Sequence, residues 1–325
     1  MKDLKVSITG ASGFIGQRLM LALNQQNHSI TVLSRKEDRG FPVGVRVIKG
    51  DLRSNDCALD QFLNGCDVLF HCAGEVREPK IMREVHVGGT QRLIQALNKK
   101  ANEKKKPIHW VQLSSVGVYG PPQNSANEKR VITENSLTYP KGEYEVTKLE
   151  SDDLVIRAAN SGLITYSIIR PSIVIAVDMP NSSVRSLVDV IKNKQYFNIG
   201  FFSSIATYIH VQDVIDLLVR CGDETRAKNQ VFNISNDCAL EEIIRAIAMK
   251  CEVNYPRVRL PESLVKLMVI LMSNLKEPPL TGGRVNALVA RTSYPVTKLE
   301  TALGFTPKFS VTDVVAQIAA TRSMT

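Results

Sequence analysis

The sequence has little of what metal sites and disulfide frameworks require. Its 325 residues include six cysteines, none in a C-x-x-C pair, and five histidines, none in an H-E-x-x-H motif. Spacings of those kinds hold zinc in proteins, so no metal site is expected. The cysteines are scattered, and we expect them to be free thiols in a reducing cytosol; they are Cys57, Cys66, Cys72, Cys221, Cys238 and Cys251.

Long apolar segments are also missing. The densest apolar run extends from Leu264 to Leu275 but contains Lys266, and it falls well short of the ~20 residues that a membrane span requires. We expect a buried or interfacial helix there and no transmembrane span. The opening residues MKDLK lead directly into VSIT, without the apolar core of a signal peptide. A cytoplasmic protein is therefore expected.

Aromatic residues make up only 6% of the chain, and the positive charge is not interleaved with them. The formal net charge is +9. Its clearest cluster follows a predicted helix, where cations interact favourably with the helix dipole; the cluster is Lys99, Lys100, Lys104, Lys105 and Lys106. Nucleic-acid surfaces combine basic residues with aromatic side chains that stack on bases. We therefore expect no nucleic-acid partner.

The chain does have enough hydrophobic sequence, 44% of its residues, for a large core. Short runs rich in Val and Ile predict strands, and the longer amphipathic stretches between them predict helices. The predicted strands are 5–9, 29–33, 45–49, 67–71, 109–113 and 164–169, and the predicted helices are 15–25, 58–63, 82–99 and 144–159. This alternation is typical of an α/β fold, in which a doubly wound parallel sheet is covered by helices on both faces.

The regular alternation ends near Pro171. We expect residues 1–171 to form a Rossmann domain that binds NAD(P), and residues 172–325 to form a smaller C-terminal lobe that binds substrate. The two are expected to be partly interleaved, because residues 206–211 and 230–234 again predict strands that could return to the sheet.

A glycine-rich turn follows the first predicted strand. Residues 9–16 read TGASGFIG, with Gly10, Gly13 and Gly16 in G-x-x-G-x-x-G spacing at the start of a predicted helix. Gly10 permits the tight turn, Gly13 lets backbone N–H groups approach a pyrophosphate, and Gly16 allows close packing of helix on strand. In this context the loop predicts dinucleotide binding rather than a purely structural turn. The further contacts expected from the loop are Ser12, Phe14 and Ile15.

The end of the second predicted strand bears on which dinucleotide is bound. An acidic residue there would accept hydrogen bonds from a ribose 2′-hydroxyl, whereas a basic residue would pair with a 2′-phosphate. The sequence has Arg35 at this point, and arginine binds phosphate with two parallel hydrogen bonds. NADP(H) is therefore preferred, with NAD as the alternative. In that alternative, Glu37 or Asp38 turns back to the ribose and Arg35 stacks on the adenine.

Residues after the third and fourth predicted strands are also expected at the cofactor. Asp51 is placed to accept a hydrogen bond from the adenine amino group, while Leu52 packs on the ring. The small residues Cys72, Ala73 and Gly74 suit a backbone that runs along a ribose. We interpret Cys72 as a packing residue and not a nucleophile, because the sequence shows no base near it.

Tyr144 and Lys148 form a Y-x-x-x-K pair in a predicted helix, downstream of Ser115 at the end of the fifth strand. Side chains at positions i and i+4 share one helix face, so the Lys148 ammonium is expected to lower the pKa of the Tyr144 phenol. The phenol would then serve as an acid or base, with Ser115 hydrogen-bonded to the same substrate oxygen. This spacing often occurs by chance, and taken alone it indicates an exposed helix pair rather than a catalytic one.

The order of these motifs resembles the extended branch of the short-chain dehydrogenase/reductase superfamily, the NAD(P)-dependent epimerase/dehydratase family. The resemblance rests on the glycine loop, Asp51-Leu52, SSVGVYG at 114–120, Tyr144-x-x-x-Lys148, Arg170-Pro171, HVQDV at 210–214 and KLETALGFTP at 298–307. It implies a hydride exchanged between the nicotinamide and a substrate carbon, with Ser115, Tyr144 and Lys148 as catalytic residues. The resemblance also places four residues at the cofactor: Tyr144, Lys148, Pro171 and Ile173.

Two departures from the family pattern bear on the chemistry. Family members that dehydrate sugar nucleotides carry an Asp-Glu pair where this chain has Val116 and Gly117. Neither residue can move a proton, so dehydratase chemistry is not expected. The family also commonly has Asn in an Asn-Val-x-Gly-Thr segment where this chain has His86. We interpret His86 as a structural substitution, because histidine can supply similar hydrogen bonds.

Three functions compete. The leading hypothesis is a nucleotide-sugar 4-ketoreductase or 4-epimerase that prefers NADP(H), with Arg284 or Arg291 binding the nucleotide diphosphate. The second is a ketone reductase of hydroxysteroid or dihydroflavonol type, whose apolar substrate would meet the segment Leu264–Leu275 in a pocket or at a membrane. The third is a regulator that senses the redox state of NADP(H). The resemblance further implies a homodimer, formed through helices that begin near Met82 and Tyr144.

Overall fold

The computed structural model describes residues 4–36, 40–55, 58–101, 107–123, 125, 127–180, 182–272 and 280–323. Its central feature is a seven-stranded sheet in which every neighbouring pair of strands is parallel. The order is β3-β2-β1-β4-β5-β7-β11, with bounds β1 Lys5–Thr9, β2 Ser29–Ser34, β3 Arg46–Lys49, β4 Val68–His71, β5 Ile108–Leu113, β7 Ile164–Pro171 and β11 Gln230–Ile234. Chain direction across the sheet reverses between β1 and β4, which opens a crevice for ligands at the carboxyl ends of these strands.

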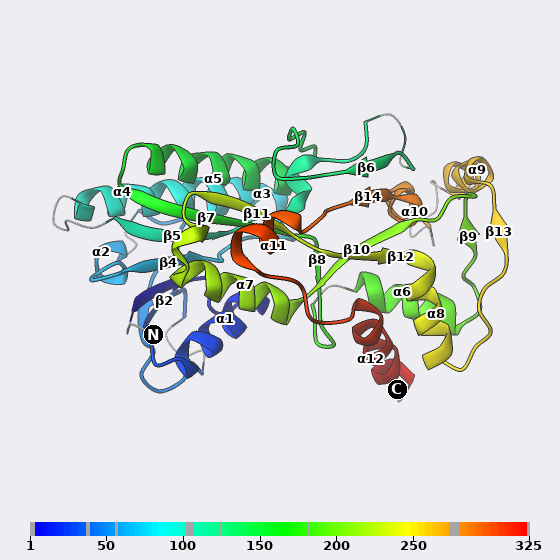
Figure 1. Cartoon of the computed structure of the whole chain (residues 1–325), viewed down its shortest axis with the longest axis horizontal. Coiled ribbons are helices and arrows are strands. Elements are labelled where there is room, and N and C mark those ends of the chain that lie inside the picture. The colour runs from blue at the N-terminus through cyan, green and yellow to red at the C-terminus, as the bar shows by residue number, and fades with distance from the viewer. Residues whose placement is uncertain are drawn as a thin grey trace.

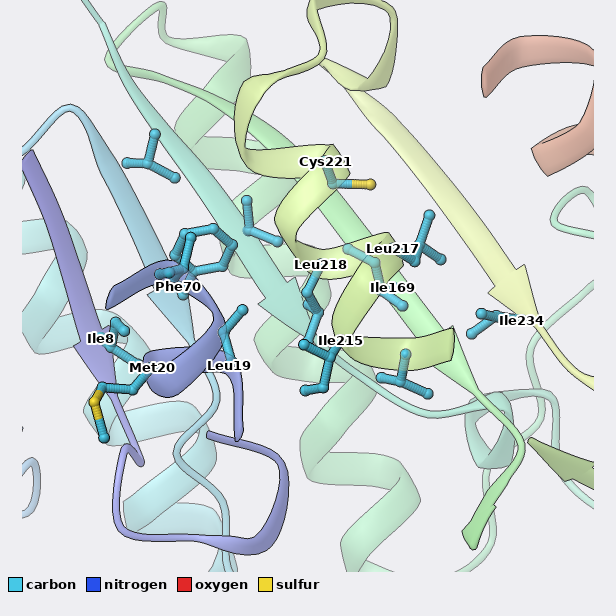
Figure 2. Packing of buried hydrophobic residues seen from close by; sticks show 14 of the residues in the cluster. Ile8, Leu19, Met20, Phe70, Ile169, Ile215, Leu217, Leu218, Cys221 and Ile234 are labelled. Carbon is cyan, nitrogen blue, oxygen red and sulfur yellow. The ribbon is translucent and has the colours of Figure 1, made fainter. Parts of the chain in front are cut away.

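Helices cover both faces of this sheet (Figure 1). On one face, α1 (Phe14–Gln25) and α7 (Val211–Asp223) pack on the strands through the side chains shown in Figure 2. On the other face lie α2 (Leu59–Phe62), α4 (Gly89–Ala101) and α5 (Glu143–Asn160). Because both faces are buried, the strands are apolar throughout, as the run VLFH in β4 shows. The α/β fold expected from the sequence is confirmed.

The six predicted strands of this sheet occur within two residues of their expected bounds. One helix prediction was wrong in detail, because residues 82–99 do not form a single α-helix. The chain instead passes from α3 (Pro79–Arg83) through a five-residue π-helical turn, η1 (Glu84–Gly88), into α4. Such wide turns frequently mark functional sites, and this one contains His86.

A second group of elements lies at the other end of the molecule (Figure 1). A three-stranded sheet, ordered β12-β10-β8, packs against three helices through an apolar cluster of its own. The bounds are β8 Ile173–Ile175, β10 Ile205–His210, β12 Asn236–Ala239, α6 Ser183–Lys192, α8 Leu240–Lys250 and α12 Val311–Ser323. Of the two later segments that predict strands, β11 thus joins the large sheet beside β7, whereas β10 pairs with β8 and β12.

Short elements complete the chain. Two pairs of short strands are β9 (Asn198–Ile199) with β13 (Arg259–Leu260) and β6 (Lys129–Val131) with β14 (Arg291–Ser293). The others are η2 Val116–Tyr119, η3 Thr225–Ala227, α9 Glu262–Met272, α10 Gly282–Val289 and α11 Thr297–Leu303. The predicted helix at 264–275 corresponds to α9, and residues 273–275 lie outside the described residues. No helix among the described residues is long and apolar enough to cross a membrane.

Candidate active site

The glycine loop joins β1 to α1 at the point where the strand order reverses. Gly10 has φ +71°, and a Cβ there would lie 2.6 Å from the backbone nitrogen of Ala73. A Cβ at Gly16 would overlap the carbonyl oxygen of Gly10. Both positions therefore exclude a side chain, and the loop presents its backbone directly at the start of α1, where free N–H groups attract a phosphate. This geometry fits the pyrophosphate of a dinucleotide.

Buried hydrogen bonds join the carboxyl ends of β1 and β4 to each other and to α4. Thr9 Oγ1 contacts His71 Nδ1 at 2.7 Å and accepts from the Ala73 backbone N–H at 3.2 Å. His71 Nε2 lies 3.2 Å from Thr90 Oγ1 on α4. Burial, followed by the charge of Lys148, lowers the pKa of His71 to about 3, so the ring is neutral at physiological pH. The ends of β1 and β4 are thus joined to α4 without a buried charge on the histidine.

Asp51, which is expected at the adenine, is held by one arginine and influenced by a second. Arg53 binds the Asp51 carboxylate with both Nε and Nη2, the shortest distance being 2.7 Å. The pKa of Asp51 is lowered chiefly by Arg53, and Arg35 contributes through its charge. Arg53 was not anticipated from the sequence, although its position two residues after Asp51 was a usable signal. Glu37 and Asp38, the alternative ribose partners, lie outside the described residues.

The proposed catalytic residues lie at the start of η2, which Ser115 caps, and on α5. Lys148 is 4% exposed, and its Nζ donates a hydrogen bond of 2.5 Å to the Leu113 carbonyl oxygen at the end of β5. Ser115 follows β5 and accepts a hydrogen bond of 3.0 Å from the Gly117 backbone through Oγ. Tyr144 occupies the first turn of α5, one turn before Lys148. The end of β5 and the start of α5 therefore lie side by side.

The expected effect of Lys148 on Tyr144 is not found in this arrangement. The pKa of Tyr144 is raised to about 12, first by burial and then by the negative charges of Glu145 and Asp152. Burial likewise lowers the pKa of Lys148, and Asp152 opposes that effect. Tyr144, Lys148 and Asp152 are spaced four residues apart on one face of α5, so the charge of Lys148 is balanced by Asp152 instead of acting on the phenol alone. The prediction considered the i+4 pair without this third residue.

Asp152 was not singled out from the sequence, and it is the centre of a buried polar network. Its Oδ2 accepts hydrogen bonds from Ser114 Oγ at 2.7 Å and from Arg170 at 3.1 and 3.2 Å. Arg170 also donates to the Tyr119 hydroxyl at 3.0 Å, and Tyr119 donates to Asn233 at 2.9 Å. The network ties α5 to β7, to η2, to β11 and to Ser114 at the end of β5.

His86 joins two segments that border the site. Its Nε2 accepts a hydrogen bond of 2.9 Å from the Glu75 backbone N–H, so Nδ1 carries the proton and donates to Thr147 Oγ1 at 2.7 Å. The ring also packs edge-on against Tyr144, with centroids 5.6 Å apart. Burial lowers the pKa of His86 to about 3. These contacts are those of a structural residue, which also fixes the position of the first turn of α5.

The remaining predicted residues occupy several elements. Cys72 lies against Gly10, and Gly74 lies against His86. Burial raises the pKa of Cys72 to about 12, which does not favour a nucleophilic thiolate.

The two arginines predicted to bind the substrate diphosphate lie on later elements. Arg291 lies on β14, with its guanidinium 4.8 Å from the centroid of the Phe202 ring. Arg284 is exposed on α10, while Pro171 ends β7 and Ile173 begins β8. Among the described residues, no group of three or more His, Cys, Asp or Glu side chains is arranged to hold a metal.

A glycine loop at the switch point of a parallel sheet, with a buried lysine and a tyrosine on the helix beside it, defines a dinucleotide-binding α/β protein. The chain belongs to the NAD dependent epimerase/dehydratase family, whose model matches residues 6–235. The resemblance seen in the sequence is thereby confirmed, and the protein is an NAD(P)-dependent enzyme of the extended short-chain dehydrogenase/reductase type.

Individual proteins are similar over much of the chain. N-acetyl-alpha-D-glucosaminyl-diphospho-ditrans,octacis-undecaprenol 4-epimerase of Escherichia coli O157:H7 is 24% identical over 319 residues, which cover 94% of this chain and 91% of that protein. A 4-hydroxy-2-methyl-3-oxo-4-farnesyl-3,4-dihydroquinoline-1-oxide ketoreductase of Stigmatella aurantiaca is 26% identical over 219 residues, 66% of this chain and 63% of that protein. The structure of MoeE5 in complex with UDP-glucose and NAD shares the fold, with a TM-score of 0.71, 23% identity, and coverage of 98% of this chain and 99% of that chain.

Proposed function

We propose that the protein is an oxidoreductase or epimerase that prefers NADP(H) and acts at C4 of a nucleotide-linked sugar. The observation that carries this proposal is the juxtaposition of two features: the glycine loop at the switch point, and the α5 face bearing Tyr144 and Lys148 beside Ser115. The similarity to a sugar 4-epimerase and to a protein solved with UDP-glucose and NAD supports the choice of substrate.

The loop fits the cofactor, because Gly10 and Gly16 let the backbone turn tightly against Ala73 and pack on itself, which leaves the N–H groups at the start of α1 free for a pyrophosphate. Arg35 would bind a 2′-phosphate, and Lys148 would bind the hydroxyls of the nicotinamide ribose. When bound, the nicotinamide supplies the carbon that exchanges hydride with the substrate.

At the substrate oxygen, Tyr144 would give or take the proton and Ser115 would hold the oxygen in place. The pKa of Tyr144 must fall well below about 12 for this role near neutral pH, although Asp152 offsets the charge of Lys148 in the structure. We propose that Lys148, on the same helix face, lowers that pKa once cofactor and substrate are bound. Charge that develops on the oxygen is then met by donors already in position.

Cofactor binding tests this proposal directly. The purified protein is denatured to release and identify any bound nucleotide, and the emptied protein is titrated with NADPH and NADH by nicotinamide fluorescence. Tightly bound nucleotide recovered with the protein favours an epimerase, which keeps its cofactor. An empty protein that binds NADPH well and NADH poorly favours a reductase. A protein that binds neither contradicts the catalytic function.

We also propose a cytoplasmic homodimer, whose native mass in solution would be twice that of one chain. A regulator that senses NADP(H) is the less favoured alternative, because Ser115, Tyr144 and Lys148 are all present. A Tyr144→Phe variant that keeps the full biological role would revive it.

One observation favours a second candidate, reduction of an apolar ketone. The helix α9 exposes Leu264, Leu267, Met268 and Leu271 on one stripe, while Val265 on its other side is buried. The similar ketoreductase from Stigmatella aurantiaca acts on a substrate with a farnesyl chain, which an apolar surface of this kind would accommodate. NADPH oxidation with a long-chain aryl ketone, and none with a UDP-4-keto sugar, would favour this candidate.

A further inference from the structure

Glu145, the residue after Tyr144, reaches over Gly117, where the chain lacks a side chain. A Cβ added at Gly117 would lie 2.8 Å from Glu145 Cγ, 3.6 Å from its Oε1 and 3.3 Å from Ser115 Oγ. A Cβ at Gly142 would overlap Glu145 Oε2. The Glu145 side chain therefore occupies the space that two glycines leave open, and both it and Ser115 Oγ border the position that a Cβ of residue 117 would take.

The accessible side of η2 is the side that Glu145 covers. Ser115 and Gly117 are partly accessible, whereas Val116 and Val118 between and beyond them are buried in an apolar cluster. Ser115, one of the proposed catalytic residues, and Gly117 therefore lie on the same, accessible side of this segment. The sequence argued against dehydratase chemistry because Val116 and Gly117 replace the Asp-Glu pair of the family's dehydratases. In the structure, a glutamate side chain from α5 lies beside Gly117.

The other glutamates at the start of α5 have cationic partners, and Glu145 does not. Arg83 lies 3.4 Å from Glu143 and 2.5 Å from Glu150. No hydrogen bond or ion pair joins the Glu145 carboxylate to another residue in the part of the chain that the structure describes. Its negative charge acts instead on its neighbour, the Tyr144 phenol. A half-buried carboxylate with unfilled acceptor positions, beside the partly accessible Gly117, is suited to receive a ligand hydroxyl.

A capping role is the main competing explanation. Glu145 is the third residue of α5, a position from which a glutamate can accept the backbone N–H of the residue before the helix. That residue is Gly142, and the structure has no such hydrogen bond from it. Glutamine caps a helix at this position as glutamate does, so the two roles are separable by experiment.

We propose that Glu145 is a substrate-binding residue, which accepts a hydrogen bond from a sugar hydroxyl beside the reacting carbon and so selects a neutral sugar over an acidic one. This inference rests on the proposed function, because it assigns the substrate class of the same site. A carboxylate that must bind a hydroxyl rejects an anionic substituent at that place by charge repulsion. The residue thereby also disfavours substrates that lack the hydroxyl.

The test compares UDP-glucose with UDP-glucuronic acid, which carries a carboxylate on the sugar. Binding of each to the NADP⁺-loaded protein is measured by calorimetry for wild type and Glu145→Gln. We expect wild type to bind UDP-glucose about tenfold more tightly than UDP-glucuronic acid, and Glu145→Gln to abolish most of that preference. Gly117→Ala should also reduce the preference for UDP-glucose, because its methyl group would displace Glu145 Cγ.

Glu150→Gln, which removes an exposed glutamate from the same helix, is the matched control and should leave the preference unchanged. If wild type and Glu145→Gln show the same preference for UDP-glucose over UDP-glucuronic acid, the inference is overturned. If that preference is unchanged, and Glu145→Ala is less thermally stable than wild type while Glu145→Gln is as stable, Glu145 is a helix cap instead. Binding of neither UDP-sugar by a protein that does bind NADPH would overturn this inference and the nucleotide-sugar substrate together. A protein that binds no cofactor would contradict the proposed function itself.

Discussion

Several charged side chains near the proposed site are paired with side chains of opposite charge. Arg53 pairs with Asp51, and Arg35 also lowers the pKa of that carboxyl through its charge, so Asp51 is held as a carboxylate between two arginines. Asp152 balances Lys148 and Arg170, two cations that would otherwise be buried without a counter-charge. The chemistry of the site therefore depends on pairs, and each pair can be tested by changing one member.

Arg35→Ser is expected to weaken NADPH binding by about 1.5–3 kcal/mol, which is the range for hydrogen bonds to charged groups. NADH lacks the 2′-phosphate, so its affinity should change little. Fluorescence titrations of both cofactors measure the two values. Arg226→Ser provides the control, since that arginine pairs with Glu224 on the surface. Equal losses for NADPH and NADH would show that Arg35 does not read the 2′-phosphate.

Asp152→Ala is expected to lower the free energy of unfolding by about 3–5 kcal/mol, because it leaves the Arg170 guanidinium buried without its carboxylate. Asp152→Asn should cost less, since it keeps the size and one acceptor oxygen. Urea unfolding of the three proteins gives the values. A loss below 1 kcal/mol for Asp152→Ala would mean that water or another residue compensates Arg170.

At the scale of elements, the π-helical turn between α3 and α4 is linked by a hydrogen bond to the first turns of α5. The turn places His86 between the loop that follows β4 and Thr147 of α5. Periodicity predicted one continuous helix here, since the apolar spacing on both sides of the turn is helical. A wide turn leaves little trace in that pattern, because it adds about one residue to a single turn. The interpretation of His86 as structural agrees with these contacts.

His86→Ala is expected to lower the free energy of unfolding by about 2–4 kcal/mol, since it removes two buried hydrogen bonds and leaves a cavity. It should also loosen Tyr144, whose ring packs on the imidazole. Thermal unfolding reports the first effect, and turnover of the folded variant at low temperature reports the second. Thr147→Val tests the same link from α5. Unchanged stability in both variants would contradict the bridging role.

At the scale of the whole molecule, three buried histidines make stability depend on pH. The pKa values of His71 and His86 are lowered to about 3 and that of His109 to about 4, mainly by burial. The unfolded chain therefore binds more protons than the folded protein below the usual histidine pKa of about 6.5. Stability is then complete above that pH and decreases as the pH falls towards the lowered values.

Each of these three histidines should lower the free energy of unfolding by about 2 kcal/mol at pH 5 relative to pH 8. Denaturant unfolding at several pH values in this range measures how the free energy of unfolding changes with pH. Asp213 and Asp237, whose pKa values are raised mainly by burial, act in the opposite sense. The comparison of wild type with His109→Gln isolates the histidine contribution, and a slope identical in both proteins would contradict it.

The sequence by itself determined the parts of this protein that depend on neighbours along the chain. The strands of the parallel sheet follow from short apolar runs, and Gly10 and Gly16 mark the loop because only glycine fits their backbone contacts. Tertiary structure decided the rest. It brought Glu145 over Gly117, His86 to Thr147, and Asp152 to Arg170. The members of each pair are far apart in the chain, and no local periodicity encodes which distant side chain fills a given space.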